Sequence, residues 1–576
     1  MLVKSYYHDT RYPLCPYTLP ELWEKAALRD AGNKVTWVDP FEEMGQKELY
    51  NQAMQVAKGL MALGMKRGDT LCCFGSRGSD PAIMFIACSS LGIIYMCNHL
   101  YAPVDQLMQK IISKVKPTAV LIGEIPCDET PFSSHFVRSS QSVTDHKISH
   151  VIFDRKAEKL DGYSKSSDWR SLSSVMAEGV KTISDELLAS SKSKVEKREP
   201  CLYSLSSGST GDIKLVLLSG ATFAKIDKTK PEFKVLGLPD AATEEITLCA
   251  QLVESRFVNR DLVVFPYGGR REEKTIVSEL LQAIETYRVT GFYTDQYYIM
   301  KIVNIPEYRE GFDLSSLCCI ITAGNIVSLE FKRRMLKIAS LSIDIYGSTE
   351  FFSTVAAEGG SLLLRPTSVG QPYPNTEAKV VDENGDIVPV NVRGQLLLRG
   401  PFLFLEYKDQ PELTAAAKTA DGWFKTGDLV SMDEAGYLYI YGRMANSLRW
   451  KVAGDVVYSC SIESILRTHP SIKTCLVAGT KAEVSLEHEI NYVIEAVPDS
   501  GLTPEDIKNF AMEKMNTRLE WPIRIFMYEH DELPYTSGSR RKLNRKALQE
   551  QIEARVAANP KENLVWDEEV YSGSYS

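Results

Sequence analysis

A short loop in the N-terminal half of the chain carries the residues best suited to holding phosphate. Hydroxyl side chains surround two glycines and a lysine follows; the set is Ser206, Ser207, Gly208, Ser209, Thr210, Gly211 and Lys214. Glycines allow backbone N–H groups to turn inward around an anion, hydroxyls add donors, and lysine adds positive charge. The loop does not fit the G-x-x-x-x-G-K-[ST] phosphate motif. Because a Ser/Gly loop alone is more often a flexible connector, its interpretation depends on the residues downstream.

Four further motifs follow in order along the chain. They are Tyr346-Gly-Ser-Thr-Glu350, Gly422-Trp-Phe-Lys-Thr-Gly-Asp428, Gly436-Tyr-Leu-Tyr-Ile-Tyr-Gly-Arg443 and Leu533-Pro-Tyr-Thr-Ser-Gly-Ser-Arg-Arg-Lys542. Simpler interpretations exist for several members: Asp428 as a turn former, Glu350 as a surface acid, and Tyr346 as a packed core aromatic. Lys214 is almost as well explained as a solvated loop lysine. The order of the motifs favours chemistry at Asp428, Glu350 and Arg443.

These ordered motifs resemble those of the adenylate-forming (AMP-binding) superfamily, which contains acyl-CoA synthetases, adenylation domains of peptide synthetases and beetle-type luciferases. The resemblance extends from about Val35 to about Leu548. It implies that a carboxylate attacks the α-phosphorus of Mg²⁺-bound ATP, giving acyl-AMP and pyrophosphate, and that a thiol, usually that of CoA, then takes the acyl group. The expected partners are therefore a carboxylic acid, ATP and CoA, with Mg²⁺ as the metal. Positioning and charge neutralisation dominate such chemistry.

The resemblance implies a phosphate and metal site. Residues 206–211 and Lys214 correspond to the loop that grips the β- and γ-phosphates. Thr349 corresponds to a phosphate contact. Glu350, together with Thr210, corresponds to the ligands of Mg²⁺, a cation that prefers oxygen.

The resemblance also implies a nucleoside site. The adenine is expected between Gly324 and Tyr346, and Gly347 is expected beside the nucleotide and the acyl group. Asp428 corresponds to the carboxylate that accepts both ribose hydroxyls. Arg443 corresponds to a donor to the same sugar.

A lysine near the C-terminus corresponds to the family's cation that neutralises charge between the carboxylate and the α-phosphate. Anchoring the motif on Leu543-x-Arg545 gives Lys542, which we take as the prediction. Anchoring it on Leu533-Pro534 gives Arg540 instead, because this chain is longer between the two anchors than the family pattern.

The hinge and the phosphate loop depart from the family pattern. The segment after Arg443 is longer by two residues and has Ala445 and Asn446 where acids are usual, although Lys451 still fits as a nucleotide-side residue. Ile213 and Leu215 stand where the loop usually has proline and glycine. These departures motivate one alternative, a catalytically weakened homologue that acts by binding.

The acyl pocket is expected around residues 290–298. Phe292, Tyr293, Tyr297 and Tyr298 are candidates for an aromatic-lined tunnel, although clustered aromatics are more often core. The resemblance implies a histidine in this region for light-emitting members, and the chain has none between His150 and His469, which disfavours light-emitting chemistry. The leading prediction is an acyl-CoA ligase for a medium-chain fatty or aromatic acid. A second alternative is an adenylating enzyme that passes the acyl group to a carrier protein or an amine.

The elements that must position these residues follow from periodicity. Apolar residues at helical spacing over 46–63 predict a helix ended by Gly64, and the apolar run Thr70–Phe74 predicts a buried strand. Strands alternating with helices imply covered, mainly parallel sheets. From Val369 the pattern changes to antiparallel hairpins. We therefore expect an α/β fold with a large N-terminal body (1–441) of several subdomains, one of them β-rich, and a small mobile α+β domain (442–576).

Composition limits the class of protein. The 576 residues carry a net charge of −9, which argues against general nucleic-acid binding because phosphate contacts need clustered Lys and Arg. The uncharged stretch 81–104 contains Ser, Asn and His, so it fits a buried helix and strand better than a membrane span. The first residues lack the apolar core of a targeting segment, so a cytoplasmic location is expected.

Overall fold

The computed structural model builds the chain from two large sheets, one antiparallel sheet and a smaller C-terminal α+β unit. It describes residues 3–11, 13–29, 32–38, 41–76, 78–98, 104–123, 132–159, 169–207, 213–224, 235–239, 261–265, 273–294, 296–323, 327, 329–351, 355–356, 365, 367–444, 447–449, 456–467, 469–481, 488–515, 520–529, 532–534 and 544–566.

An eight-stranded sheet forms the first layer, in the order β20-β10-β9-β5-β4-β6-β7-β8. Its strands are β4 (Thr70–Phe74), β5 (Ile94–Asn98), β6 (Ala119–Ile122), β7 (His150–Phe153), β8 (Arg170–Ser171), β9 (Pro200–Ser207), β10 (Ile213–Ser219) and β20 (Glu406–Tyr407). The strands from β9 to β8 pair in parallel, whereas β9, β10 and β20 pair antiparallel. The residues on either side of the predicted phosphate loop are therefore the two arms of a hairpin.

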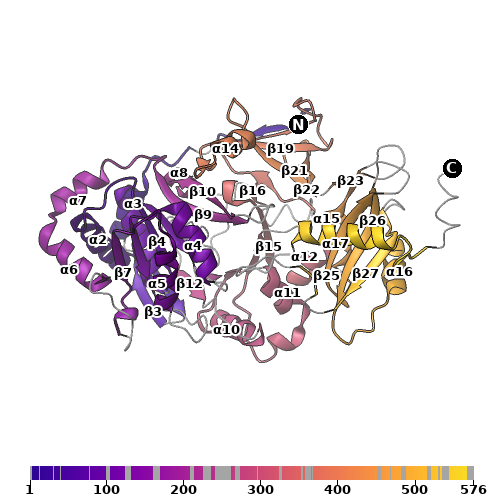
Figure 1. The fold of residues 1–576 in the computed structure, drawn as a ribbon, viewed down its shortest axis with the longest axis horizontal. Helices are drawn as coiled ribbons and strands as arrows, with labels where there is room; N and C mark the ends of the chain where they lie inside the picture. The colour runs from indigo at the N-terminus through magenta and orange to yellow at the C-terminus, as the bar shows by residue number, and fades with distance from the viewer. Residues whose placement is uncertain are drawn as a thin grey trace.

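Helices cover both faces of this sheet, as expected for parallel strands. They are α1 (Leu19–Arg29), α2 (Gln46–Ala62), α3 (Ser79–Leu91), α6 (Leu172–Thr182) and α7 (Asp185–Lys192) on one face, with α4 (Val104–Val115) and α5 (Phe132–Ser142) on the other. Side chains alternate accordingly along β4: Leu71 and Cys73 pack with the first group, and Cys72 and Phe74 with the second. Figure 1 shows α6 and α7 at the outer edge of this layer.

A nine-stranded sheet forms the second layer, in the order β17-β16-β15-β14-β13-β11-β12-β2-β3. Its strands are β2 (Lys34–Val38), β3 (Phe41–Gly45), β11 (Val235–Pro239), β12 (Asp261–Phe265), β13 (Gly291–Tyr293), β14 (Cys319–Ala323), β15 (Leu341–Tyr346), β16 (Val355–Ala356) and β17 (Gln371–Pro372). The strands from β2 to β15 are parallel. Side chains of α10 (Glu273–Thr286), α11 (Gln296–Asn304) and α12 (Leu329–Met335) pack on one face, and the opposite face shares a core with the first layer.

An antiparallel sheet follows, as the hairpin pattern predicts. It contains β1 (Tyr6–His8), β18 (Glu377–Val381), β19 (Gly394–Arg399), β21 (Phe424–Met432) and β22 (Leu438–Arg443), and α14 (Pro411–Ala417) lies before β21. Figure 1 shows β1 lying with β19 and β21 near the label N, although their positions in the sequence are far apart.

The C-terminal unit has its own small core. Its elements are β23 (Ser447–Arg449), β24 (Val456–Tyr458), α15 (Ser459–Leu466), β25 (Ile472–Lys481), β26 (His488–Ala496), α16 (Pro504–Lys514), β27 (Arg524–Tyr528) and α17 (Arg545–Ala558). Thr503 and Asp506 form the capping box that starts α16. The predicted boundary after residue 441 lies inside β22, against which α15 packs; the division and its mobility stay predictions.

Two features differ from expectation or add to it. The Ser/Lys/Glu-rich composition of residues 133–200 predicts exposed helix and loop, but this segment contains β7, whose Ile152 and Phe153 are buried. A strand of four residues leaves too short an apolar run to stand out in a Ser/Lys/Glu-rich sequence.

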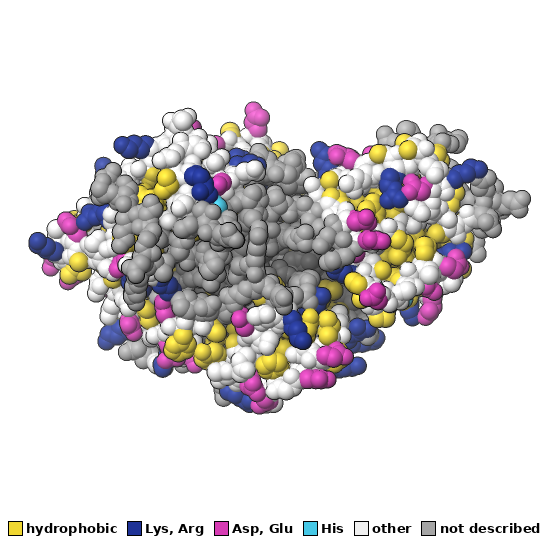
Figure 2. Space-filling model, turned by 60° about the horizontal axis from the view of Figure 1, so that its bottom comes forward, with side chains coloured by type: hydrophobic (Ala, Val, Ile, Leu, Met, Phe, Trp, Pro, Cys, Tyr) yellow, Lys and Arg dark blue, Asp and Glu magenta, His cyan; other side chains and the backbone are white. Residues whose placement is uncertain are grey.

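No helix among the described residues is long and apolar enough to cross a membrane. On the face in Figure 2, the described positive and negative side chains lie interspersed.

Candidate active site

The Thr-Gly-Asp motif forms a fixed corner at the end of the antiparallel sheet. Asp428 of β21 lies directly opposite Arg443 of β22, and Arg443 Nε is 3.0 Å from Asp428 Oδ1. The Asp428 backbone N–H donates to Thr426 Oγ1 at 3.1 Å, and Thr426 O accepts from Arg443 Nη1 at 2.6 Å. Gly427 sits between them at φ +74°, a conformation that favours glycine. The motif is therefore more than a surface turn, because its backbone and side-chain hydrogen bonds hold the ion pair between Asp428 and Arg443 in place.

The phenol of Tyr346 completes this group from the neighbouring sheet. Tyr346 ends β15, and its hydroxyl donates to Asp428 Oδ2, whereas the ion pair with Arg443 Nε is made by Oδ1. Burial and the adjacent carboxylate hold the pKa of Tyr346 well above its ordinary value, so the phenol stays a donor. Burial raises the pKa of Asp428, which Arg443 and Tyr346 oppose and Glu350 reinforces. Asp428 is thus an ionisable acceptor whose two oxygens are already oriented.

Glu350 lies in a single turn, η3 (Thr349–Phe351), two residues after Gly347-Ser348 leave β15. It is buried, and among the described residues each of its oxygens accepts a hydrogen bond: Oε1 from the Tyr407 hydroxyl at 2.8 Å and Oε2 from Ser348 Oγ at 2.7 Å. A carboxylate offers about four lone-pair sites, so each oxygen keeps acceptor capacity. Glu350 is therefore not a surface residue, and its carboxylate oxygens are suitable ligands for a hard cation.

An aromatic layer joins the two acids. Ring centroids are 5.2 Å apart for Tyr346 and Phe351, 5.7 Å for Phe351 and Phe424, and 5.4 Å for Phe424 and Phe404. Phe404 continues the layer to Tyr407 at 4.8 Å. Tilted and edge-to-face pairs of this kind add about 0.5–1.5 kcal/mol each beyond burial. Tyr346 is thus both a packed aromatic and a polar contact, so the two interpretations of it are compatible.

Lys214 reaches the same group from the hairpin. It lies on β10 opposite Ser206 of β9, and its Nζ is 5.4 Å from the centre of the Tyr407 ring. Pairing of β10 with β20 places Val216 beside Tyr407 and so brings the hairpin to Glu350. The strand positions of Ser206 and Ser207 are described, but their side chains are not.

The described residues thus bring together Lys214, Tyr346, Gly347, Thr349, Glu350, Asp428 and Arg443, although these are spread over more than two hundred positions of sequence. The remaining predicted site residues, Gly208, Ser209, Thr210, Gly211, Gly324, Lys451 and Lys542, lie outside the described residues, as does the alternative Arg540.

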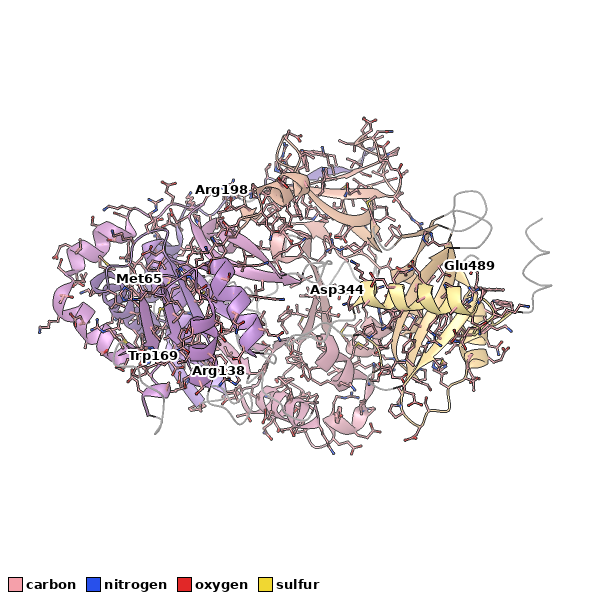
Figure 3. The ribbon with its side chains drawn as sticks, in the orientation of Figure 1. Met65, Arg138, Trp169, Arg198, Asp344 and Glu489 are labelled. Atoms are coloured by element: carbon pink, nitrogen blue, oxygen red, sulfur yellow. The ribbon has the colours of Figure 1, made fainter. Side chains whose placement is uncertain are left out.

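Two buried polar contacts, one at Glu350 and one on β15 two residues before Tyr346, were missed by sequence reasoning. One is the bond from Tyr407 to Glu350; Tyr407 lies in an apolar run without a motif. The other is a buried ion pair of 2.5 Å between Lys332 Nζ of α12 and Asp344 Oδ2 of β15, with Thr322 of β14 donating to Asp344 Oδ1 at 2.5 Å. Figure 3 labels Asp344 near the middle of the view. For this ion pair the sequence offered one signal, which is that Asp344 lies two residues before Tyr346.

The aromatic tunnel prediction is wrong for Phe292. This residue is buried in β13 and packs edge-on against Phe265 of β12, with ring centroids 5.9 Å apart. Both faces of a central parallel strand are covered, so the ring lies in core. Tyr298 packs against the same core, whereas Tyr293 packs against the core shared by the two layers. The side chain of Tyr297 lies outside the described residues.

Comparison with known proteins identifies the class. The AMP-binding enzyme family matches residues 23–408, which is more than half of the chain. The chain therefore belongs to this family of enzymes, and proteins named as acyl-CoA ligases are among its relatives.

Individual relatives agree with this assignment. The protein is 27% identical over 497 residues to the medium-chain acyl-CoA ligase ACSF2, mitochondrial, of Danio rerio, covering 81% of this chain and 78% of that one. It is 30% identical over 261 residues, 45% of each chain, to the medium-chain fatty-acid–CoA ligase of Escherichia coli (strain K12).

Solved structures share the fold, which confirms the predicted α/β class. The crystal structure of the anthranilate CoA ligase AuaEII in complex with anthranoyl-AMP matches with a TM-score of 0.77 at 20% identity, covering 95% of this chain and 99% of that one. ATP-bound MatB from Rhodopseudomonas palustris matches with a TM-score of 0.71 at 18% identity, covering 93% and 99%.

Proposed function

We propose that the protein is an ATP- and Mg²⁺-dependent ligase that converts a carboxylic acid to acyl-AMP and then to acyl-CoA. The observation that carries the proposal is the juxtaposition of two buried acids with different surroundings. Asp428 is paired with Arg443 and Tyr346 and suits the ribose hydroxyls, whereas Glu350 is held by neutral donors and suits a cation. One protein carboxylate with nucleotide phosphates is a usual way to hold Mg²⁺.

Each described residue has a task in this reaction. Asp428 accepts from the sugar and so fixes the nucleotide, and Tyr346 provides a ring beside the base. Lys214 contributes positive charge near the outer phosphates, and Glu350 holds the cation that offsets phosphate charge. Holding the acid and the α-phosphorus together supplies much of the acceleration, since positioning alone is worth about 7–11 kcal/mol in favourable cases. Lys542 stays the proposed cation at the α-phosphate.

The proposed acid is a medium-chain fatty or aromatic acid. The names of relatives support both classes, since they include medium-chain acyl-CoA ligases and a 4-coumarate–CoA ligase-like protein of Oryza sativa subsp. japonica, 32% identical over 40% of this chain. A cytoplasmic location stays a prediction, and the ACSF2 relatives are named as mitochondrial.

The test is pyrophosphate release from ATP with a panel of straight-chain and aromatic acids. Release that depends on the acid supports adenylation, and formation of a thioester on addition of CoA, detected by mass, supports the complete proposal. Absence of release with every acid contradicts it and favours the catalytically weakened homologue.

Transfer to another acceptor is the second candidate. The amide bond synthetase McbA from Marinactinospora thermotolerans shares the fold with a TM-score of 0.71 at 18% identity, covering 93% of this chain and 99% of that one. Acid-dependent pyrophosphate release without a CoA thioester, but with an amide when an amine is supplied, favours this candidate.

A further inference from the structure

We propose that Tyr407 is a positioning residue that holds Glu350 in the orientation needed to bind Mg²⁺, and that it links this acid to Lys214 of the phosphate-loop hairpin. The inference rests on the proposed function, because it takes Glu350 as a cation ligand. Tyr407 touches both groups through different parts of one side chain: its hydroxyl donates to Glu350 Oε1 at 2.8 Å, and its ring lies 5.4 Å from Lys214 Nζ.

The backbone around Tyr407 is held from two sides. Its strand, β20, pairs with β10 next to Val216, and the Tyr407 N–H donates to Thr414 Oγ1 of α14 at 2.9 Å. Lys418 donates to the carbonyls of Phe404 and Leu405 at 3.0 and 2.7 Å, which fixes the chain just before β20. These backbone contacts place the Tyr407 hydroxyl beside Glu350, and none of them depends on the metal.

The phenol and Ser348 donate to different oxygens of Glu350. The Tyr407 hydroxyl donates to Oε1 at 2.8 Å, and an ionised carboxylate can only accept such bonds. With Ser348 Oγ on Oε2 and Tyr407 on Oε1, one donor on each oxygen fixes the plane of the carboxylate. The remaining lone pairs then face a fixed direction. Partners of this kind around a metal ligand typically change metal affinity by about 10- to 100-fold when removed.

Tyr407→Phe separates the two contacts, because it removes the hydroxyl and keeps the ring beneath Lys214. The matched control is Tyr439→Phe, which removes a second tyrosine–carboxylate bond, from Tyr439 to Asp433 at 3.2 Å, in the hairpin between β21 and β22. Ser348→Ala is a second variant that weakens the same carboxylate from its other oxygen.

The experiment measures the Kd of ATP by calorimetry on the full chain, with Mg²⁺ and with EDTA, in the absence of any acid. The ratio of the two Kd values reports how much the metal adds to binding. We expect Tyr407→Phe to reduce this ratio by about tenfold or more, with metal-free ATP binding unchanged and Tyr439→Phe equal to wild type. Ser348→Ala is expected to change the ratio in the same direction, which keeps the test informative if Tyr407→Phe does not fold.

Two results would overturn different claims. If Glu350→Gln abolishes the metal effect while Tyr407→Phe and Ser348→Ala keep it within twofold of wild type, the positioning role is wrong and the metal assignment stands. If Glu350→Gln keeps the full metal effect, the assignment of Glu350 as a metal ligand fails, and the positioning role fails with it. Acid-dependent pyrophosphate release, measured in parallel, reports on the adenylation activity separately.

Discussion

Replacing Tyr346 with phenylalanine tests whether Asp428 binds the nucleotide as a carboxylate. The substitution removes the hydroxyl that donates to Asp428 Oδ2 and keeps the ring that packs on Phe351. The Tyr346 hydroxyl is one of the groups that lower the pKa of Asp428, opposing the effect of burial, so its loss raises that pKa. As the pH is lowered, Asp428 is therefore protonated earlier in Tyr346→Phe than in wild type. Nucleotide binding that needs the ionised carboxylate is lost at a correspondingly higher pH.

The size of the effect follows from the bond. A hydrogen bond to a charged group contributes about 1.5–3 kcal/mol, and one pKa unit corresponds to about 1.4 kcal/mol. Asp428 is only 5% exposed, so solvent replaces little of the lost bond. The acid limb of ribose-dependent binding is therefore expected to move upward by about one to two pH units.

The assay compares ATP with 2′,3′-dideoxy-ATP by calorimetry across pH. Both ligands titrate alike at their phosphates, so the ratio of their Kd values isolates the ribose contact. The ratio should fall toward one as Asp428 is protonated, and it should do so at higher pH in Tyr346→Phe than in wild type or Tyr439→Phe. A ratio of one at every pH in wild type refutes the ribose assignment; an unchanged acid limb in Tyr346→Phe refutes the electrostatic argument.

Three further predictions concern buried charge and the C-terminal cation. Lys332→Met leaves Asp344 buried without its ion-pair partner and should cost about 3–5 kcal/mol in urea unfolding, whereas Lys332→Met combined with Asp344→Leu should recover most of the loss; an equally unstable double variant contradicts this. Burial raises the pKa of Asp154 from 3.8 to about 6, so the stability of wild type relative to Asp154→Asn should decline by roughly 2 kcal/mol as the pH rises from 4 to 6, and a flat difference contradicts the shift. Lys542→Ala should slow acid-dependent pyrophosphate release by about 10²–10³-fold, and full activity there with loss in Arg540→Ala would move the role to Arg540.

Local periodicity determined much of the fold in advance. The helix predicted over 46–63 is α2, and the buried strand Thr70–Phe74 is β4. The antiparallel hairpins predicted from Val369 onward include the pairing of β18 (Glu377–Val381) with β19, which begins at Gly394. These elements are long or strongly alternating, so their hydrophobic periodicity can be distinguished from that of the surrounding sequence. The short strand β7 was missed because four residues carry too little pattern.

The site was predictable where it consists of motifs and unpredictable where it consists of contacts. Asp428 and Arg443 were found through their motifs, and the structure adds that they face each other across one strand pair. Tyr407 and Glu350 are 57 positions apart and meet through a two-residue strand, which no local pattern encodes. The error at Phe292 has the opposite origin, since an aromatic cluster looks the same in sequence whether it lines a pocket or fills a core.

The pairing of β1 with β18 has a consequence for synthesis in the cell. Tyr6 donates through its hydroxyl to Glu377 Oε2 at 2.8 Å, although the two residues are 371 positions apart. At about 5–20 residues per second a ribosome needs roughly 20 to 70 s to make the chain between them. During that interval the earliest strand has no partner, so the antiparallel sheet is completed late, and a bulky fusion placed just before Tyr6 should delay maturation of this sheet more than one placed after α17.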